Sequence, residues 1–477
     1  MLPWFKKRDE YLDLVLVMCP GWGVIQAPAA IGYLKGFLEA NNITCRCFDI
    51  NIKSYKMFDE KKYWELNYPD HFVLPHMFER DIQKFLAPFI DIWARRILEF
   101  KPRAVGLSLY MSSINASVAL ARSLKKMEPQ IVIIGGGPEV DRIKRVALDG
   151  IRPISPANRD IFDTFDVLVS GEGEETLLEL MSKIKKGEDF STTTGIVLKR
   201  DEQIIANSPR ELMKDLDLIP EPDYTDLDLA DYTGKALPVV TSRGCINRCT
   251  FCADSPLWKR YRCLSPEKTV KDMRNLAKRY SASSFEIVDS IFNGDIERLE
   301  KICDLIIDSG IRMQWSAKAM LRREMDYRLL SKMKKAGCCA LAYGVESGSP
   351  GVLKDMRKST DLGAIRRIIK DTHSAGIEPN CFFIIGYPTE TEEDFKQTLR
   401  FIEEMGEFIH RFDQVTSCHI EEGSFLGLNT ETYGITFDDQ GHWYSKESTP
   451  EIRQERMGRF RDLARKLHTH YECEVQA

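Results

Sequence analysis

The chain has 477 residues, of which 43% are hydrophobic and 29% charged, and its formal net charge is −5. This length allows two or three domains with sizeable cores, and the slightly acidic balance gives no basic footprint for nucleic acid. No apolar run reaches the roughly 18 residues that a membrane span needs, and we expect a charged turn rather than a signal peptide at the N-terminus. The odd number of scattered cysteines, thirteen, argues against a disulfide framework and for a reducing, cytoplasmic location.

Residues 1–190 alternate short strand-like and helix-like segments. Strands are predicted at 12–18, 43–50, 104–110, 131–134 and 167–169, and helices at 29–40, 115–127 and 174–185. This alternation predicts an α/β domain with a doubly wound parallel sheet, whose ligands bind at the carboxyl ends of the strands. Residues 51–100 interrupt the pattern as an insertion of helix and loop, which either covers a ligand face or has a small core of its own.

Residues 191–236 are predicted to be a linker, because the segment LIPEPDY at 218–224 is rich in proline. From 237 to 425 the alternation resumes. Six strands are predicted, at 237–241, 284–288, 312–316, 340–344, 380–385 and 414–420. Six steps are fewer than the eight of a full barrel, so we expect a partial (β/α)6 barrel with a lateral opening. Residues 426–477 form a C-terminal extension with a closing helix at 451–471.

Cys245, Cys249 and Cys252 follow the first of these six strands in the spacing C-x3-C-x2-C. Thiolates are the ligands of iron–sulfur clusters, and three cysteines leave one iron of a four-iron cluster open to a ligand with an amine and a carboxylate. A zinc site usually needs four ligands in two pairs, and the chain has no second C-x2-C pair. A disulfide would need an oxidising compartment. Three structural cysteines remain the alternative.

The whole chain resembles the radical S-adenosylmethionine (SAM) enzymes that carry an N-terminal cobalamin-binding domain. In the C-terminal part the resemblance rests on the cysteine loop and on YRCLSPEKTV, VDSIFNGD, GVESGS and FFIIGYPTETEEDF. In the N-terminal part it rests on VGLSLYMSS, IIGGGPEV and VLVSGEGEETL. It implies a Rossmann-like domain before the barrel, and a 4Fe-4S cluster, SAM and cobalamin as cofactors.

The resemblance also implies roles for individual residues. The three cysteines would hold the cluster. The residues expected at SAM are Phe251, Asp289, Ser290, Asn293, Glu346, Ser347, Ile385 and Gly386. The residues expected at cobalamin are Ser108, Tyr110, Ser112, Gly135, Gly136 and Gly137. A capped strand–helix turn is the alternative for Glu346 and Ser347, and an ordinary tight turn is the alternative for the three glycines.

The chain departs from the family pattern at two places. The D-x-H-x-x-G motif of other cobalamin domains is absent, because CPGWGVIQAP follows the first strand without a histidine; the radical SAM relatives often lack that histidine too. Near the end of the third barrel strand, Met320 stands where many relatives have an arginine. Lys318 and Arg322 lie nearby, so the cation that pairs with the SAM carboxylate is open.

The function expected from the resemblance is cobalamin-dependent methylation of an unactivated carbon. Its partners would be an organic substrate (a small molecule, a lipid or a peptide) and an electron donor such as flavodoxin or ferredoxin, with no nucleic acid and no membrane span. Cys418 would either donate hydrogen to a substrate radical or pack as a small hydrophobe. The alternatives are another radical reaction, such as ring formation, C–C coupling or epimerisation, and a non-catalytic protein with a structural cluster or cobalamin.

Overall fold

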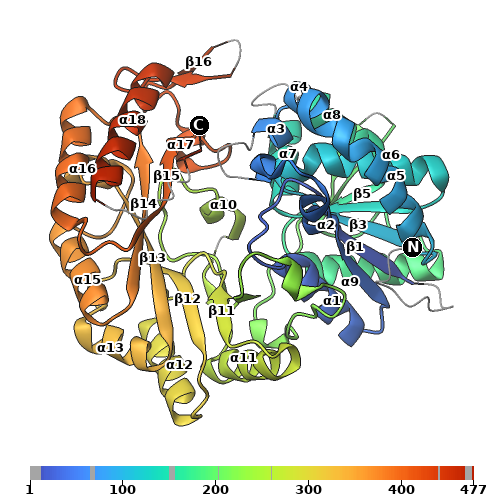
Figure 1. Cartoon of the computed structure of the whole chain (residues 1–477). Helices are drawn as coiled ribbons and strands as arrows, with labels where there is room; N and C mark the ends of the chain where they lie inside the picture. The colour runs from blue at the N-terminus through green and yellow to red at the C-terminus, as the bar shows by residue number, and fades with distance from the viewer. Residues whose placement is uncertain are drawn as a thin grey trace. The chain divides into compact units, whose positions relative to one another are not determined.

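The computed structural model describes residues 12–64, 70–149, 156–201, 203–258, 260–438, 441–467 and 475–476. It divides into two compact units, an N-terminal unit of residues 1–214 and 218–235 and a C-terminal unit of residues 215–217 and 236–477. Figure 1 draws both. The charged turn expected over residues 1–11 lies outside the described residues.

The N-terminal unit contains a seven-stranded sheet in the order β2-β1-β3-β4-β5-β6-β7. Its first five strands are parallel, and β6 and β7 are added antiparallel. The strands are β1 (Leu14–Met18), β2 (Cys45–Asp49), β3 (Ala104–Ser108), β4 (Val132–Gly136), β5 (Val167–Val169), β6 (Ile196–Arg200) and β7 (Gln203–Ala206). The chain leaves β1 toward β2 on one side and toward β3 on the other, which confirms the predicted doubly wound arrangement.

Both faces of this sheet are covered by helices. Alternate residues of β1 point to opposite faces: Val15 and Val17 belong to one buried cluster, and Leu14 and Leu16 to the other. The helices α1 (Ala29–Ala40) and α9 (Gly173–Lys186) supply the second cluster. The first is supplied by α5 (Lys84–Leu98), α6 (Ile114–Met127), α7 (Pro138–Asp149) and α8 (Pro156–Thr164).

The segment predicted as an insertion does not form a core of its own in the described residues. It contains α2 (Ile50–Met57), a 3-10 turn (Lys61–Trp64), α3 (Asp70–Val73), α4 (Pro75–Met77), a π-helical turn (Phe78–Gln83) and α5. Phe72, Phe78 and Ile82 are buried in the same cluster as Val15 and Val17 of the sheet. The insertion therefore extends one face of the N-terminal core.

Residues 218–235, expected as part of a linker, pack against the N-terminal unit. The Lys35 ammonium, on α1, lies 2.6 Å from an Asp226 oxygen and 3.3 Å from an Asp223 oxygen, and is 3% exposed. Asp226 also accepts a hydrogen bond from the Cys47 amide of the edge strand β2. The Tyr232 hydroxyl donates to the buried Asp49 carboxylate at 2.7 Å. These contacts explain why the segment belongs to the unit that precedes it.

The C-terminal unit is built on a parallel sheet in the order β8-β11-β12-β13-β14-β15-β18. Its strands are β8 (Leu237–Val239), β11 (Ser284–Ile287), β12 (Gln314–Ala319), β13 (Cys338–Glu346), β14 (Glu378–Ile385), β15 (Arg411–Ser417) and the short β18 (Val475–Gln476). Helices connect consecutive strands from β8 to β15, as Figure 1 shows. This arrangement confirms the partial (β/α)6 barrel, and each of the six predicted strands agrees with its observed bounds within three residues.

Side-chain caps define where the barrel helices begin. Ser or Asp or Thr precedes each helix and accepts a hydrogen bond from a first-turn amide. The pairs are Ser265 before α11 (Pro266–Tyr280), Asp295 before α12 (Ile296–Asp308), Asp326 before α13 (Tyr327–Lys335), Asp361 before α15 (Leu362–Ser374) and Thr391 before α16 (Glu392–Met405). The caps fix each βα loop at its helical end, so the loops at the carboxyl edge of the barrel start and stop at defined residues.

The C-terminal extension contains α17 (Phe425–Leu428), the hairpin of β16 (Thr436–Phe437) and β17 (Trp443–Tyr444), and α18 (Pro450–Leu467). The helix α18 packs on α16 and on β14 and β15. The predicted closing helix is confirmed, although residues 468–471 of that prediction lie outside the described part of the chain.

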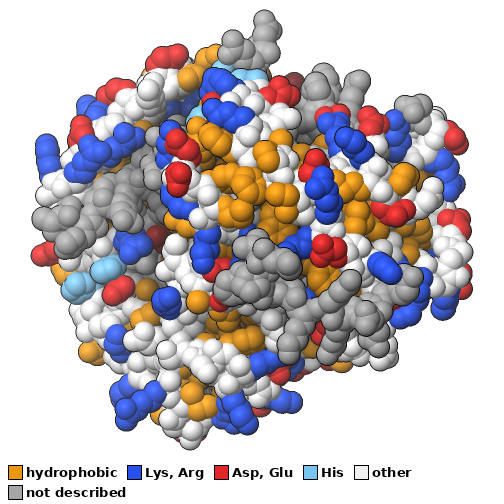
Figure 2. Space-filling model, turned by 45° about the vertical axis from the view of Figure 1, so that its right-hand side comes forward, with side chains coloured by type: hydrophobic (Ala, Val, Ile, Leu, Met, Phe, Trp, Pro, Cys, Tyr) orange, Lys and Arg blue, Asp and Glu red, His pale blue; other side chains and the backbone are white. Residues whose placement is uncertain are grey.

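Among the described helices, none combines the length and the apolar character that crossing a membrane requires. On the face drawn in Figure 2, the described basic and acidic side chains are interspersed with one another. Ion pairs among the described residues include Arg367 with Asp371 and Lys183 with Glu179.

Replacing Lys35 with methionine is expected to destabilise the N-terminal unit by about 3–5 kcal/mol, because it leaves the buried Asp223 and the partly buried Asp226 carboxylates without their cation. Urea denaturation would measure the loss. Lys56→Met is the matched control, since Lys56 is half exposed and Asp231 also pairs with Lys53; it should cost less than about 1 kcal/mol. Equal losses for the two variants would contradict the buried-pair account.

Candidate active site

The three cysteines lie on the loop that follows β8, at the carboxyl edge of the barrel. The loop runs through the two-residue strand β9 (Ser242–Arg243) and ends at α10 (Asp254–Trp258). All three side chains are half-buried and form no disulfide. The Asn247 amide donates to the Cys245 sulfur at 3.4 Å, and the Asn247 side chain donates to the Cys249 sulfur at 3.3 Å. Hydrogen bonds of this kind stabilise thiolates and tune iron–sulfur clusters.

Asp289 fixes the start of the cysteine loop. This residue follows β11 and is 2% exposed. One carboxylate oxygen accepts from the Thr241 amide, and the other accepts from the hydroxyls of Thr241 and Ser242, each at 2.7 Å. Burial raises the pKa of the Asp289 carboxyl, and these hydrogen bonds oppose the rise. The side chain thus acts on the loop that carries the cysteines.

Ser290 and Asn293 also bond to protein groups. The Ser290 hydroxyl donates to Asp254 at 2.7 Å, just beyond the third cysteine. The fully buried Asn293 side chain bonds both the amide and the carbonyl of Met320, each at 2.8 Å. Arg322 donates to the carbonyls of Asn293 and Gly294, whereas Lys318 is exposed. The structure thus joins the ends of β8, β11 and β12 into one network.

Glu346 ends the fourth strand of the barrel in an uncommon conformation. Its φ of 67° is left-handed, and the register with β14 shifts between Gly344 and Glu346. The carboxylate lies 3.1 Å from the Lys358 ammonium. A Cβ on Gly344 would stand 2.2 Å from a Glu346 carboxylate oxygen, so the carboxylate lies directly over the backbone of Gly344. A non-glycine residue in this region costs about 1–3 kcal/mol and is typical of functional sites.

Ser347 has a different environment from Glu346. It is fully buried, its hydroxyl lies 3.2 Å from the Thr398 hydroxyl, and it accepts from the Ser349 amide at 3.1 Å. Ser349 then caps α14 (Pro350–Asp355). The surroundings of Ser347, unlike those of Glu346, are therefore those of a capped turn between a strand and a helix.

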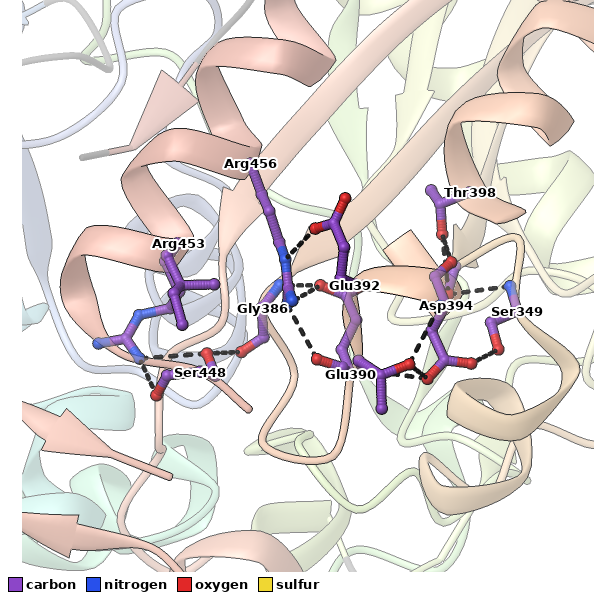
Figure 3. Close-up of polar contacts among 12 residues, drawn as sticks. Ser349, Gly386, Glu390, Glu392, Asp394, Thr398, Ser448, Arg453 and Arg456 are labelled. Atoms are coloured by element: carbon purple, nitrogen blue, oxygen red, sulfur yellow. Dashed lines mark hydrogen bonds and ion pairs between the residues drawn. The ribbon is translucent and has the colours of Figure 1, made fainter. Parts of the chain in front are cut away.

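The loop after the fifth strand is held by the C-terminal extension, as Figure 3 shows. The Gly386 amide donates to the buried Glu390 carboxylate at 2.8 Å, and Arg456 of α18 lies 3.2 Å from the same oxygen. The Gly386 carbonyl accepts from Ser448 at 2.7 Å. Gly386 has a φ of 77°, and a Cβ there would stand 2.4 Å from the Arg453 side chain. Ile385, the last residue of β14, is fully buried. Burial raises the pKa of Glu390 to about 7.

Cys418 belongs to an apolar cluster against which Phe251 packs. Cys418 follows β15 directly, rather than lying within it, and is buried among Tyr387, Ile420 and Trp443. Phe251 is partly buried against this cluster. Burial raises the pKa of the Cys418 thiol. These surroundings match the packing alternative for Cys418.

In the N-terminal unit, the residues predicted at cobalamin lie together at the carboxyl edge of neighbouring strands. Ser108 of β3 pairs with Met18 of β1 and with Gly136 of β4. Tyr110 and Ser112 continue from β3, and the Tyr110 amide donates to Ser113. Burial raises the pKa of Tyr110 to about 12.

The three glycines have unequal surroundings. A Cβ on Gly135 would meet Leu168 at 2.5 Å, and one on Gly137 would meet the Leu109 carbonyl at 2.6 Å. Both glycines are therefore required for packing and for the turn. A Cβ on Gly136 would meet only Val169, at 3.8 Å. Gly136 is thus the one of the three that leaves space at this edge.

Two features of the sites were missed in the sequence. Trp22, after β1, lies against Tyr110 with ring centroids 3.9 Å apart and ring planes tilted by 32°. The Asn51 side chain holds this loop by accepting from the amides of Gly21 and Trp22. The WG pair that follows the first strand was the available signal. The other feature is Lys358, for which the spacing of the cysteines gave no signal.

The donor set fits a cluster rather than a single metal ion. Among the described residues, no three His, Cys, Asp or Glu side chains form a group that could hold one ion. Three half-buried thiols on a single loop, two of them with N–H donors, instead suit a cluster in which each cysteine binds its own iron.

The comparisons with known proteins agree with this geometry. Residues 239–402 match the family model of the radical SAM superfamily. The chain is 28% identical over 321 residues to an uncharacterized methyltransferase of Pyrococcus horikoshii, covering 66% of this chain and 67% of that protein. It is 24% identical over 319 residues to an anaerobic magnesium-protoporphyrin IX monomethyl ester cyclase of Cereibacter sphaeroides, covering 64% of this chain and 50% of the relative. The chain thus spans about half to two thirds of these relatives.

The fold comparison covers both units. The radical SAM methyltransferase TsrM from Kitasatospora setae, solved with cobalamin and a [4Fe-4S] cluster bound, matches with a TM-score of 0.69 at 15% identity, over 96% of this chain and 89% of TsrM. The chain therefore carries a radical SAM domain, which uses a [4Fe-4S] cluster and SAM. The fold of the chain is similar to that of TsrM.

Replacing any one of Cys245, Cys249 and Cys252 with alanine is expected to remove the cluster, because each thiolate binds a different iron. Iron and sulfide content and the visible spectrum of the anaerobically reconstituted protein would measure the loss. Cys418→Ser is the matched control and should keep a full cluster, since that thiol lies in an apolar cluster. A full cluster in any of the three alanine variants would contradict the ligand assignment.

Glu390→Gln is expected to change how stability depends on pH. Burial raises the folded pKa of Glu390 to about 7 from the usual 4.5, so its favourable contribution is fully present below pH 4.5 and is lost as the pH rises through 7. Glutamine does not ionise. The unfolding free energy of the variant relative to the natural protein should therefore increase between pH 5 and pH 8. Parallel pH profiles in urea titrations would contradict this account.

Proposed function

We propose that this protein is a cobalamin-dependent radical SAM methyltransferase that methylates an unactivated carbon. The observation that carries the proposal is the combination of two units in one chain. A three-cysteine loop lies at the carboxyl edge of a (β/α)6 barrel, and a doubly wound sheet precedes it with the order β2-β1-β3-β4-β5. The named methyltransferases among the similar proteins support the same reaction.

In this proposal the barrel residues divide into two groups. We assign contact with SAM to Phe251, Glu346, Ile385 and Gly386. We assign loop positioning to Asp289, Ser290, Asn293 and Ser347, because their side chains bond to the loops at the ends of β8, β12 and β13. When bound, the cluster supplies the electron that cleaves SAM to methionine and a 5′-deoxyadenosyl radical.

The carboxyl edge of the N-terminal sheet is the proposed cobalamin site. Ser108, Tyr110, Ser112 and Gly136 lie on neighbouring strands there, and only a distant Val169 atom faces the open side of Gly136. Gly135 and Gly137 shape the turn. Because the loop after β1 contains no histidine, the proposal includes no cobalt ligand from that loop. When bound, cobalamin supplies the methyl group.

The proposal includes two partners. A radical SAM domain needs a substrate and a reductant, and we infer an organic substrate (a small molecule, a lipid or a peptide) and a flavodoxin or ferredoxin. We also place the protein in the cytoplasm. All twelve cysteines in the described part of the chain are free, which suits a reducing compartment.

A second candidate function is a radical SAM reaction of another class, above all ring formation. It is favoured by the similarity to a protein named as a cyclase. That similarity covers 64% of this chain. In that case the N-terminal unit would be empty or would bind cobalamin without methyl transfer.

Product analysis distinguishes these candidates. Protein reconstituted with iron, sulfide and cobalamin, and incubated anaerobically with SAM and a chemical reductant, is expected to form both S-adenosylhomocysteine and 5′-deoxyadenosine. The Cys252→Ala variant should lose 5′-deoxyadenosine, because no cluster is present to cleave SAM. It should form at most one equivalent of S-adenosylhomocysteine per cobalamin, because the methyl group then has no substrate radical to accept it. Liquid chromatography with mass spectrometry would quantify both products.

Other outcomes would reject the proposal. Formation of 5′-deoxyadenosine without S-adenosylhomocysteine, in protein that holds cobalamin, would favour ring formation or another radical reaction. Absence of both products from protein with a full cluster would favour a non-catalytic role.

A further inference from the structure

Lys358 is a cation beside the cysteine loop that the sequence did not single out. Its side chain is 17% exposed, and its ammonium lies 3.1 Å from the Glu346 carboxylate. A Cβ on Gly344, near the carboxyl end of β13, would stand 3.2 Å from the same ammonium. The side chain therefore lies over the end of the fourth barrel strand, at the edge that carries the cysteines.

The segment that carries Lys358 is bonded to the cysteine loop. Thr250, which follows Cys249, donates its amide to the Met356 carbonyl at 3.1 Å and its hydroxyl to the Asp355 carbonyl at 3.3 Å. Tyr387 donates to the same Asp355 carbonyl, and its hydroxyl lies 2.8 Å from that of Thr250. Asp355 and Met356, which precede Lys358, are thus hydrogen-bonded to the chain between the second and third cysteines.

A strained turn directs the chain from this anchor to Lys358. After α14, the Lys358 amide bonds to Leu353 and the Arg357 amide to Lys354, which is the pattern of a Schellman motif. Glycine is usual at the left-handed position of this motif, but Arg357 occupies it with a φ of 57°. Glu346 is left-handed as well. Two non-glycine residues in this conformation thus lie in or next to one ion pair, and such strain is typical of functional sites.

The ammonium of Lys358 lies on a segment that is bonded to the cysteine loop. Its acidic partner is Glu346 at 3.1 Å. Met356, two residues before Lys358, accepts from the amide of Thr250, the residue that follows Cys249. A half-buried cation is screened less by salt than an exposed one.

We propose that Lys358, oriented by Glu346, is a positioning residue of the cluster site that stabilises the reduced state of the [4Fe-4S] cluster. Reduction adds one negative charge to a group that already carries three thiolates, and a neighbouring cation lowers the free energy of the more negative state. Glu346 has the opposite effect and also holds the lysine side chain in place. This inference rests on the cluster of the radical SAM domain and is independent of the proposed methyl transfer.

An anaerobic redox titration followed by electron paramagnetic resonance tests the proposal, with the full-length reconstituted protein and without SAM, cobalamin or substrate. In Lys358→Gln the ratio of reduced to oxidised cluster at a fixed potential should fall about tenfold, which is about 59 mV toward more negative potential for a one-electron couple. In Glu346→Gln the midpoint should move in the opposite direction, because a negative charge is lost.

Two control variants separate charge from structure. Lys358→Arg keeps the charge and should keep a midpoint close to that of the natural protein. Lys354→Gln removes a cation from the exposed side of the same helix and should leave the midpoint unchanged. Iron content and circular dichroism would show that each variant is loaded and folded.

Unchanged midpoints in both Lys358→Gln and Glu346→Gln, or shifts in the same direction, would overturn the proposal. If Lys358→Gln does not retain the cluster, Glu346→Gln and Lys358→Arg still decide it, because a purely structural role predicts no positive shift in the former. Because the titration contains no SAM or cobalamin, its result is independent of whether the protein transfers methyl groups.

Discussion

The buried carboxylate of Asp289 is the interaction on which the active site depends. Its two oxygens bind the Thr241 amide and the hydroxyls of Thr241 and Ser242, so the chain that leaves β8 has a fixed position three residues before the first cysteine. Arg298 of α12 donates to the Thr241 carbonyl from within the same buried network. A loop with three thiols has little apolar surface of its own to hold it in place. Its geometry comes from the neighbouring strand and helix of the barrel.

The same principle applies to the loops after the later strands. Asn293 bonds the backbone after β12, Ser349 and Thr398 hold the turn after β13, and Glu390 with Arg456 hold the turn after β14. Most polar residues of the recognised motifs therefore bond to protein groups. The groups that we propose to bind a cofactor are backbone edges and a few side chains, among them Glu346 and the three cysteines. Sequence motifs of this kind report how loops are fixed as much as what they bind.

What the sequence predicted well was local. The hydrophobic periodicity predicted both parallel sheets, and the cysteine spacing marked the loop to which we assign the cluster, because each signal lies within a few adjacent residues. Lys358 was missed because its approach to the cysteines depends on a β-bulge in β13 and on a turn more than a hundred residues beyond them in the chain. Trp22 was missed because its partner Tyr110 comes from the neighbouring strand β3. The sequence predicted a linker at residues 218–235 because the partners of this segment are remote in sequence. Asp226 pairs with Lys35 of α1, and Tyr232 pairs with Asp49 of β2.

That last segment has a practical consequence for any attempt to produce the two units separately. A fragment that ends at residue 190 would lack β6 and β7 of the sheet. In that fragment Lys35 would have lost its acidic partners, and Asp49 would have lost the hydroxyl of Tyr232. The fragment would keep buried ionic groups without counterparts, and its expression would be expected to yield aggregates. An excision near residue 235 keeps these partners on one polypeptide, and the barrel fragment then begins just before its first strand.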